Sequence, residues 1–311
     1  MTITVLSGGV GAARLLQGIV AVVDPASVTA IVNTGDDLVL HGLMISPDLD
    51  TITYTLAGAI SRKQGWGLEG ETWNAMEQLG NRYGGQTWFG LGDRDLATHL
   101  FRTQRRGAEG VTLSEVTAEI TAAWDLGGLR LLPMSDDVVS TRITLAETND
   151  EIGFQEYFVG RHHDVAVTSV RFAGSDAARP APGVLEAIDG AERVVIAPSN
   201  PIVSIGPILD VPGVADAVRA RRHDVVAVSP IIAGAALKGP ADRLLTELGH
   251  ESSVVGVARL YAPCCATLVI DEADAPLAAA VEAEGVRAVV APTIMTSPEV
   301  AAALAEVVLS S

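Results

Sequence analysis

The N-terminal residues join a short apolar run to a glycine-rich loop and a helical pattern. Residues 3–6 (ITVL) lead directly into residues 7–14 (SGGVGAAR), and apolar residues at helical spacing follow. This order of strand, glycine loop and helix lets backbone N–H groups and a helix N-terminus meet a phosphate. We therefore predict the first βα unit of an α/β fold. The residues predicted to hold the phosphate are Gly8, Gly9, Val10, Gly11 and Arg14.

The glycine loop alone is only moderately specific. Its pattern Gly9-x-Gly11-x-x-Arg14 has arginine where the dinucleotide-binding fingerprint has a third small residue. It also lacks the Gly-Lys-Ser/Thr ending of a P-loop. A tight turn that needs positive φ is the structural alternative, and the loop pattern leaves it open.

Short apolar runs recur along the chain with helical stretches between them. Because these runs are continuous rather than alternating, they are typical of strands buried on both faces of a parallel sheet. The fold class predicted is α/β, a doubly wound, mostly parallel Rossmann-like sheet. Strands are predicted at 3–6, 28–33, 193–197, 225–229, 253–258, 267–270 and 287–291, and helices at 211–221 and 276–284.

The middle of the chain has a different pattern. Residues 51–126 contain three or four helical segments without a convincing strand, one of them opened by a capping box at 112–115 (TLSE). Two strands are predicted after them, at 142–146 and 154–159. We interpret residues 51–165 as a mainly helical insertion over the sheet's carboxyl edge, within a single α/β domain of residues 1–311.

Composition excludes several classes of partner. The formal net charge of −17 disfavours binding to a nucleic-acid backbone, which needs basic surface. No apolar run approaches the ~18 residues of a membrane span, and no signal peptide is recognisable, so we expect a cytoplasmic protein without membrane contact. The adjacent Cys264 and Cys265 are expected to be reduced and fall short of a zinc site.

Carboxylates cluster after the second predicted strand. Asn33, Asp36 and Asp37 fall at the sheet edge that also carries the glycine loop. Two acids beside an amide suit Mg²⁺, although an Asx-type turn would use the same residues. Asp48 and Asp50 follow just before a helix, where they could cap it or face a metal or a substrate hydroxyl.

Two further polar stretches are candidate parts of a site. In residues 90–99 (GLGDRDLATH), Asp93 or Asp95 at a helix start would lie one turn from His99, with Arg94 between the acids. A capped helix with a solvated face is the alternative there. After later strands come 198–201 (PSNP) and 229–230 (SP), in loops where such folds bind ligands. The side chains predicted to bind are Ser199 and Asn200 in the first of these loops and Ser204 in residues 204–207 (SIGP), which follow it.

Together these stretches resemble the family of 2-phospho-L-lactate transferases of coenzyme F-420 biosynthesis, whose actinobacterial branch is described as phosphoenolpyruvate transferases. The matching motifs follow the family's order and span nearly the whole chain. They are SGGVGAAR at 7–14, NTGDD at 33–37, SPDLDT at 46–51, GLGDRDLATH at 90–99, LLPMSDD at 131–137, APSNPIVSIGP at 197–207 and SPIIAG at 229–234.

The resemblance implies a group transfer between two substrates. The donor would be a guanosine diphosphate ester of lactate or enolpyruvate, and the acceptor the deazaflavin Fo, whose terminal ribityl hydroxyl attacks phosphorus and releases GMP. By resemblance, Asp36 is the first metal ligand for Mg²⁺, with Asn33 and Asp37 near it. The glycine loop would hold the donor together with Ser199, Asn200 and Ser204.

The acceptor would meet the other polar residues. The resemblance gives Asp50 and Arg94 to Fo, with Asp50 orienting or deprotonating the hydroxyl and His99 as a second candidate. Asp48 and Asp93 complete the set predicted to bind substrate, whereas Asp136 and Asp137 have no assigned role. A homodimer is implied by the family alone. The three-carbon acid of the donor is not readable from the sequence.

Two other functions are weighed against the transferase. A non-catalytic nucleotide-sugar-binding regulator would share the glycine loop and the α/β fold, but would have no evident use for residues 46–51 and 90–99. An NAD-type oxidoreductase is suggested by the α/β pattern alone. The missing third glycine and the adjacent Asp36 and Asp37 argue against it.

Overall fold

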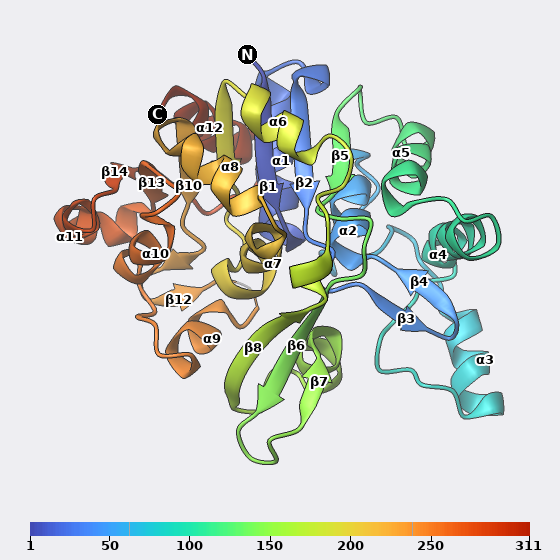
Figure 1. Ribbon diagram of the computed structural model, residues 1–311. Coiled ribbons are helices and arrows are strands. Elements are labelled where there is room, and N and C mark those ends of the chain that lie inside the picture. Colours follow the sequence, from blue (N-terminus) through green and yellow to red (C-terminus); the bar gives the residue numbers. More distant parts are fainter. Residues whose placement is uncertain (62, 238) are drawn as a thin grey trace.

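A seven-stranded parallel sheet forms the centre of the computed structural model, which describes residues 1–61, 63–237 and 239–311 (Figure 1). Its strands are short and mostly buried on both faces, as in β1, where all five residues are buried. The sheet strands are β1 (Ile3–Ser7), β2 (Val28–Val32), β5 (Arg130–Pro133), β9 (Arg193–Ile196), β10 (Val225–Val228), β13 (Thr267–Ile270) and β14 (Arg287–Val290).

The order of the strands creates a switch point beside β1. From edge to edge the sheet runs β14-β13-β10-β9-β1-β2-β5, so the chain winds outward from β1 in one direction and later from β9 in the other. β1 pairs in parallel with both β2 and β9, with Leu6 opposite Ile31 and Ile196. The loops after β1 and β9 therefore diverge and leave a crevice at the sheet's carboxyl edge, where folds of this type bind ligands.

Helices cover both faces of the sheet (Figure 1). One hydrophobic core joins alternate strand residues such as Val5 to α1, α2, α5 and α12, and the other joins residues such as Leu6 to α6, α8 and α10. The helices are α1 (Gly9–Val22), α2 (Pro47–Leu56), α3 (Asn74–Tyr83), α4 (Asp95–Thr103), α5 (Leu113–Ala123), α6 (Val184–Gly190), α7 (Gly206–Asp210), α8 (Val214–Ala220), α9 (Ala241–Glu247), α10 (Val254–Tyr261), α11 (Ala278–Ala283) and α12 (Pro298–Ser310).

Smaller elements extend beyond the carboxyl edge. An antiparallel hairpin packs with α3 and α4, a three-stranded antiparallel sheet packs against α9, and a two-stranded ribbon lies before α9. Their strands are β3 (Leu38–Leu40), β4 (Leu43–Ile45), β6 (Ser140–Leu145), β7 (Glu151–Gly153), β8 (Val167–Ala173), β11 (Ile231–Ile232) and β12 (Ala235–Ala236). The shorter helical turns are η1 (Pro25–Ser27), η2 (Gln104–Ala108), η3 (Glu156–Gly160), η4 (Ser175–Ala177), η5 (Pro201–Ile205), η6 (Arg222–Asp224) and η7 (Glu272–Leu277).

The predicted fold class is confirmed, as is the capping box that opens α5, in which Thr112 and Glu115 satisfy each other's backbone N–H groups. The strand predicted at 253–258 is wrong. Ser253 caps a helix there instead, and its Oγ accepts from the N–H groups of Val255 and Gly256. The cap outweighs the β-branched composition of the segment.

The boundaries of the predicted insertion also need correction. β5, at 130–133, falls inside residues 51–165 but pairs with β2 as the edge strand of the main sheet. The segment at 154–159 is not a strand, because β7 ends at Gly153 and the helical turn η3 follows. Its aromatic residues Phe154 and Tyr157 are three apart, so they face one core on a helical turn.

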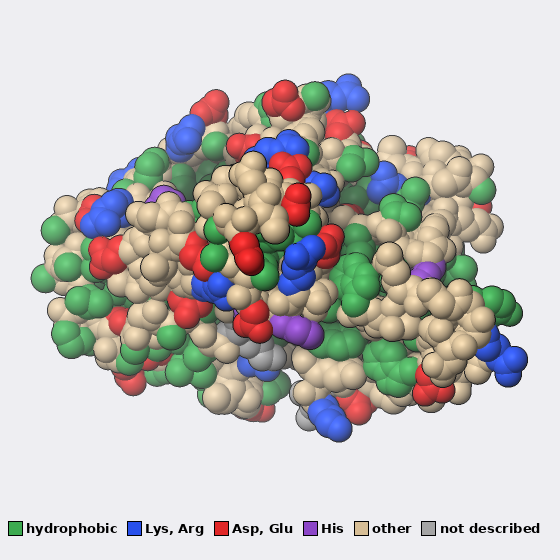
Figure 2. All heavy atoms as spheres, turned by 90° about the horizontal axis from the view of Figure 1, so that it is seen from below, with side chains coloured by type: hydrophobic (Ala, Val, Ile, Leu, Met, Phe, Trp, Pro, Cys, Tyr) green, Lys and Arg blue, Asp and Glu red, His purple; other side chains and the backbone are tan. Residues whose placement is uncertain are grey.

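The surface seen from the carboxyl edge mixes both signs of charge. Figure 2 shows acidic and basic side chains interspersed over this face, without one continuous basic field. Among the described residues no single helix is long and apolar enough to cross a membrane. One pair of helical segments, Pro201–Asp210 and Val214–Ala220, has the length and composition of a membrane span only when the two are taken together, and the pair is bent by 96° at the break between them.

Candidate active site

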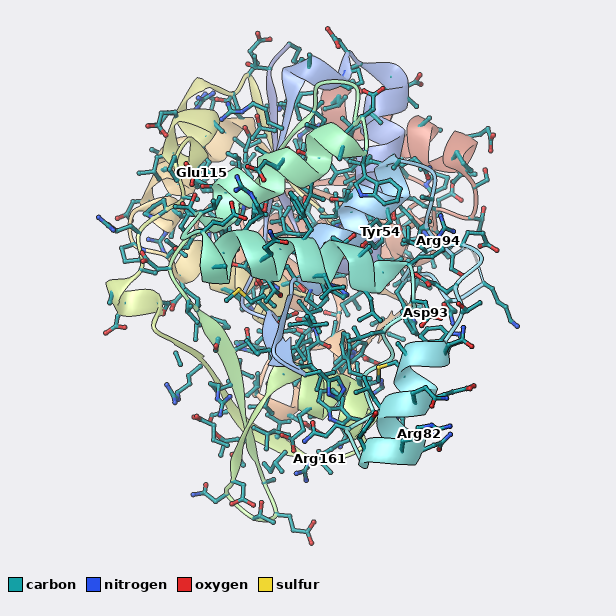
Figure 3. All side chains as sticks on the ribbon, turned by 90° about the vertical axis from the view of Figure 1, so that its right-hand side faces the viewer. Tyr54, Arg82, Asp93, Arg94, Glu115 and Arg161 are labelled. Atoms are coloured by element: carbon teal, nitrogen blue, oxygen red, sulfur yellow. The ribbon has the colours of Figure 1, made fainter. Side chains whose placement is uncertain are left out.

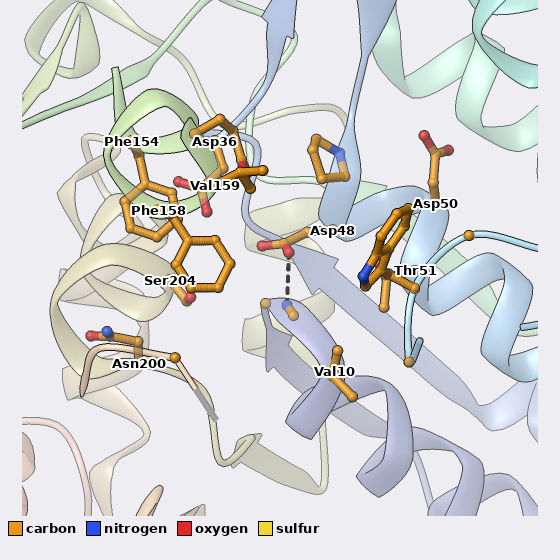
Figure 4. A pocket seen from close by; sticks show the side chains of 18 of the residues that line it. Val10, Asp36, Asp48, Asp50, Thr51, Phe154, Phe158, Val159, Asn200 and Ser204 are labelled. Atoms are coloured by element: carbon orange, nitrogen blue, oxygen red, sulfur yellow. Dashed lines mark hydrogen bonds between the residues drawn. The ribbon is translucent and has the colours of Figure 1, made fainter. Parts of the chain in front are cut away.

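A cavity of about 400 Å³ lies at the switch point of the sheet (Figure 4). The glycine loop and the start of α1 form one side, and α2 contributes residues 47, 48, 50, 51 and 54. Segments 64–67, 89–90 and 154–159 bring aromatic side chains, and the loop after β9 closes the far side. One cavity thus joins the predicted glycine loop, the aspartates of α2 and the loop after β9.

Internal hydrogen bonds organise the glycine loop. The Gly8 N–H donates to Ser199 Oγ at 3.1 Å, and the same hydroxyl donates to the Gly8 carbonyl at 2.8 Å. The Gly9 N–H donates to Asp48 Oδ1 at 2.9 Å, the bond dashed in Figure 4. Gly9 has φ +69°, which favours glycine, and a Cβ on Gly11 would lie 2.5 Å from the Pro198 carbonyl oxygen. The loop therefore fits closely against the β9 loop.

Asp36 and Asp48 form a buried pair of carboxylates at the cavity. Asp48 Oδ2 accepts from Asn33 Nδ2 at 3.0 Å, whereas Asp36 Oδ1 is buried and has no hydrogen-bond partner. Burial, and then the charge of Asp48, hold the pKa of Asp36 well above its usual range, and burial raises the pKa of Asp48 to about 6. No lysine or arginine of the described residues lines this cavity. The pair therefore lacks a compensating cation.

A second polar cluster lies further along α2, where it meets α4. Asp50 receives both terminal nitrogens of the buried Arg102, with Nη1 at 3.1 Å from Oδ2. His99 lies between two acids, with Nδ1 3.7 Å from Asp50 Oδ2 and Nε2 3.2 Å from Asp95 Oδ2. The Tyr54 hydroxyl donates to Asp95 Oδ1 at 2.6 Å. Here the Arg102 guanidinium offsets part of the negative charge.

Two sets of residues could hold a metal. Asp50, Asp95 and His99 each offer a ligand atom within 4.8 Å of the others. However, Arg102 already occupies both oxygens of Asp50, so a cation there would compete with a buried guanidinium. The set of Asp36 and Asp48 has only oxygen ligands and an unpartnered carboxylate oxygen, which suits a hard cation such as Mg²⁺.

Several residues predicted for the site lie outside the cavity lining. Asn33 donates from Nδ2 to Asp48 and accepts the Gly35 N–H at Oδ1. It therefore fixes Asp48, a candidate metal ligand, and is not itself part of the cavity lining. Asp37 accepts from the Ser46 hydroxyl at 2.6 Å, and burial raises its pKa to about 8. Arg14 donates to the Met295 carbonyl at 3.1 Å, on the outer side of α1.

Asp93 and Arg94 are likewise not among the lining residues, and Figure 3 shows Asp93 close to the start of α3. Asp93 accepts from the backbone N–H groups of Asn74 and Ala75 and from the Thr72 hydroxyl, so it caps that helix. Arg94 is exposed, and its side chain donates to the Glu69 carbonyl. Asp136 and Asp137 also bind locally, to Ser114 and to the Arg179 N–H.

Replacing Asp93 with alanine is expected to lower the melting temperature, because the start of α3 loses its acceptor. These hydrogen bonds lower the pKa of Asp93 to about 2. Since the folded pKa is depressed, the stabilisation is complete above the unfolded value of about 4 and disappears as the pH falls through the folded value. The gap between wild type and variant should shrink over that range in thermal melts. Equal melting temperatures at pH 7 would contradict the capping role.

The loop after β9 brings three predicted residues to the cavity. Ser199, Asn200 and Ser204 all line it. Asn200 Oδ1 accepts from the N–H groups of Ile202 and Val203 and so caps η5, while its Nδ2 is buried without a partner. An unpaired buried donor is costly unless a ligand meets it.

Three residues of the second cluster were not chosen from the sequence: Tyr54, Arg102 and Asp95, which was only an alternative to Asp93. A signal for two of them exists in the spacing. Asp95, His99 and Arg102 are four and three residues apart, which places them on one face of α4. That face is buried in the structure, as all three residues are less than a tenth exposed.

Comparison with known proteins decides the family. The family model described as "2-phospho-L-lactate transferase CofD" matches residues 3–305. The chain belongs to the CofD family. Curated relatives in it are named phosphoenolpyruvate transferase, and two of them cover nearly the whole of both chains. The protein of Kitasatospora aureofaciens is 47% identical over 100% of this chain and 97% of its own, and that of Streptomyces griseus is 46% identical over 98% and 96%.

A solved structure shares the fold of this CofD-family chain at much lower identity. A member of the UPF0052 family from Bacillus halodurans superposes with a TM-score of 0.63 and 16% identity, covering 99% of this chain and 98% of that one. At this identity the similarity concerns the arrangement of sheet and helices only. Five of the seven motifs singled out in the sequence contribute residues to the one cavity, whereas residues 131–137 and 229–234 are not part of its described lining.

Proposed function

We propose that this protein transfers a phosphoenolpyruvyl or 2-phospho-L-lactyl group from a guanosine diphosphate ester to the terminal ribityl hydroxyl of Fo, in coenzyme F-420 biosynthesis. The observation that carries the proposal is the single cavity with two unlike polar clusters. One cluster, at the glycine loop, lacks a cation, and the other, at α2 and α4, contains one. The first suits a donor diphosphate with its metal, and the second suits a neutral hydroxyl.

The donor is assigned to the glycine loop and the loop after β9. Residues 8–11 and Ser204 line the cavity there. The Gly8 and Gly9 N–H groups already donate to Ser199 and Asp48, so the donor would meet the N–H groups that follow them and the Ser204 hydroxyl. The free Nδ2 of Asn200 can donate to a phosphate or nucleoside oxygen. Because the lining has no described lysine or arginine, the diphosphate charge needs another partner.

Mg²⁺ is assigned to that role. Asp36 and Asp48 would hold it, with Asn33 fixing Asp48 and Asp37 behind the pair. When bound, the ion supplies charge neutralisation for the phosphoryl oxygens. The two aspartates fit the ion because their oxygens are hard ligands and one of them lacks any other partner.

The acceptor is assigned to the other end, beside Asp50, Tyr54 and His99. Trp66 and Phe89 line this cavity too and offer apolar surface to a planar ring system. Asp50 would accept a hydrogen bond from the ribityl hydroxyl and so orient it. Phosphoryl transfer passes through a loose transition state, in which orientation of the nucleophile matters more than early proton removal.

The reaction balances without a further reactant. The ribityl oxygen forms a bond to the donor phosphorus, the bond from phosphorus to the GMP oxygen breaks, and the hydroxyl proton passes to solvent or to the departing GMP. The product is a phosphodiester of Fo. The resemblance further implies a homodimer, which sedimentation equilibrium of the purified protein tests.

A mass-spectrometric assay tests the proposed activity. The protein is incubated with Fo and, separately, the enolpyruvyl, lactyl and glyceryl guanosine diphosphate esters, each with Mg²⁺ and with the metal chelated. We expect a phospho-adduct of Fo that requires the metal, formed best from the enolpyruvyl ester because the relatives carry that name. Absence of an adduct from every donor would overturn the proposal.

A further inference from the structure

Arg102 is the largest of the fully buried side chains, at 1% exposed, and nothing in the proposed chemistry uses it directly. It lies on α4 and directs both terminal nitrogens at Asp50 on α2. Nη1 also lies 3.5 Å from the Met44 carbonyl oxygen and 3.4 Å from His99 Nδ1. The guanidinium therefore bridges α4, α2 and β4 at a point where two of its neighbours, Asp50 and His99, line the cavity.

Folding stability is a weak explanation for this pair. A buried ion pair gains little net stability, because the loss of solvation offsets the attraction between the charges. Its geometry is restrictive, however, since a planar guanidinium that binds both carboxylate oxygens fixes the plane and the position of the carboxylate.

The neighbours of Arg102 reinforce this restriction. The Nδ1 of His99 lies beside the same Asp50 oxygen that Nη1 contacts. On the far side of the imidazole, Nε2 faces Asp95, which in turn accepts from the Tyr54 hydroxyl. The Thr98 hydroxyl lies 2.8 Å from the Tyr54 oxygen and can donate to it, because the single Tyr54 proton goes to Asp95. Each residue of the cluster is thus held by at least one other. Asp50, whose carboxylate Arg102 binds, lies on α2 next to Thr51 and lines the cavity (Figure 4).

We infer that Arg102 is a positioning residue for the acceptor. It holds the Asp50 carboxylate in the one orientation that can bind the acceptor hydroxyl, and it acts through Asp50 alone. This inference rests on the proposed function, because Arg102 would orient Asp50 in the part of the cavity assigned to the acceptor. It assigns Asp50 the role of a fixed hydrogen-bond acceptor whose two oxygens are already bound to a guanidinium.

The test compares acceptor and donor kinetics in four variants. Arg102→Gln should reduce kcat/KM for Fo by about 10²-fold, the scale expected when a positioned group is displaced by ~1 Å, with KM for the donor unchanged. Arg102→Lys keeps the charge without the planar guanidinium, so its kcat/KM for Fo should lie between the values of wild type and Arg102→Gln. Asp50→Asn and the double variant Asp50→Asn/Arg102→Gln complete a double-mutant cycle, which measures the coupling between the two residues. The double variant leaves no lone buried charge, so it keeps the fold testable even where Arg102→Gln does not fold.

The matched control is Arg105→Gln, one turn further along. Arg105 pairs with Glu109 and Glu119 outside the cavity, so its loss should leave kcat/KM for Fo as in wild type. If Arg102 acts only through Asp50, the double variant should match Asp50→Asn within about twofold. A double variant at least tenfold worse than Asp50→Asn would overturn the inference. So would a folded Arg102→Gln variant with wild-type kcat/KM for Fo.

Binding of Fo alone, measured by calorimetry, separates this inference from the proposed reaction. Weaker Fo binding by Arg102→Gln, with no adduct formed by wild type, would overturn the transfer and support the positioning role. Adduct formation by wild type with equal Fo kinetics and equal Fo binding in Arg102→Gln would support the transfer and overturn the positioning role.

Discussion

Replacing Asp36 with alanine is expected to reduce the rate of adduct formation by about 10³-fold, because a metal's stabilisation of phosphoryl charge amounts to several kcal/mol. Asp36 lines the cavity, is buried, and has an oxygen without a partner. No lysine or arginine is among the described residues that line the cavity with it. Without this carboxylate the proposed Mg²⁺ loses a ligand. The negative charge of the donor diphosphate then lies beside Asp48 without a cation to neutralise it.

Thermal melting provides a second readout for the same position. Burial of an uncompensated carboxylate destabilises the metal-free protein, so Asp36→Asn should melt at the same temperature as wild type or higher. Added Mg²⁺ should raise the melting temperature of wild type and not of the variant. The contrast is Asp37→Asn, next in sequence but outside the lining, which should keep most of the Mg²⁺ response. Wild-type turnover by Asp36→Ala would refute the metal assignment.

Replacing Gly11 with alanine is expected to disrupt the donor half of the site. A Cβ there would lie 2.5 Å from the Pro198 carbonyl oxygen, which is backbone and has no side-chain freedom to yield. Overpacking of this kind costs about 1–3 kcal/mol of stability. It also separates the glycine loop from the loop that carries Ser199 and Asn200, so KM for the donor should rise more than KM for Fo.

The control for this substitution is Gly190→Ala at the end of α6. A Cβ at Gly190 meets nothing within 4 Å, and the residue is not among those that line the cavity. It should leave both KM values unchanged. If Gly11→Ala had the donor KM of wild type, the close approach of the two loops would not matter for binding.

Much of the fold follows from local pattern. Continuous apolar runs such as residues 225–228 are buried on both faces, and the capping box at Thr112 opens a helix as expected. The edge strand β5 was missed because its run of Leu131 and Leu132 is short and follows a helical region. Segment 253–258 was misread because a serine cap, and not β-branched content, determined its structure.

The site was predictable where chemistry follows a strand end. Gly8 and Ser199 meet because β1 and β9 are parallel neighbours that bring their carboxyl ends to one edge. Asp93 and Arg94 were predicted to bind substrate, whereas Asp95 and Arg102 were not, because residue type alone does not reveal which face of a helix is buried. That choice depends on how α4 packs against α2 and β4, a contact between segments about 50 residues apart.

The central claim is that the cavity joins donor and acceptor in one transfer step. The most direct measurement is the ratio of GMP released to phospho-adduct of Fo formed, determined in the same reaction by chromatography and mass spectrometry. The account predicts one GMP for each adduct, and no GMP when Fo is omitted. GMP released without adduct, or an adduct formed without GMP, would contradict it.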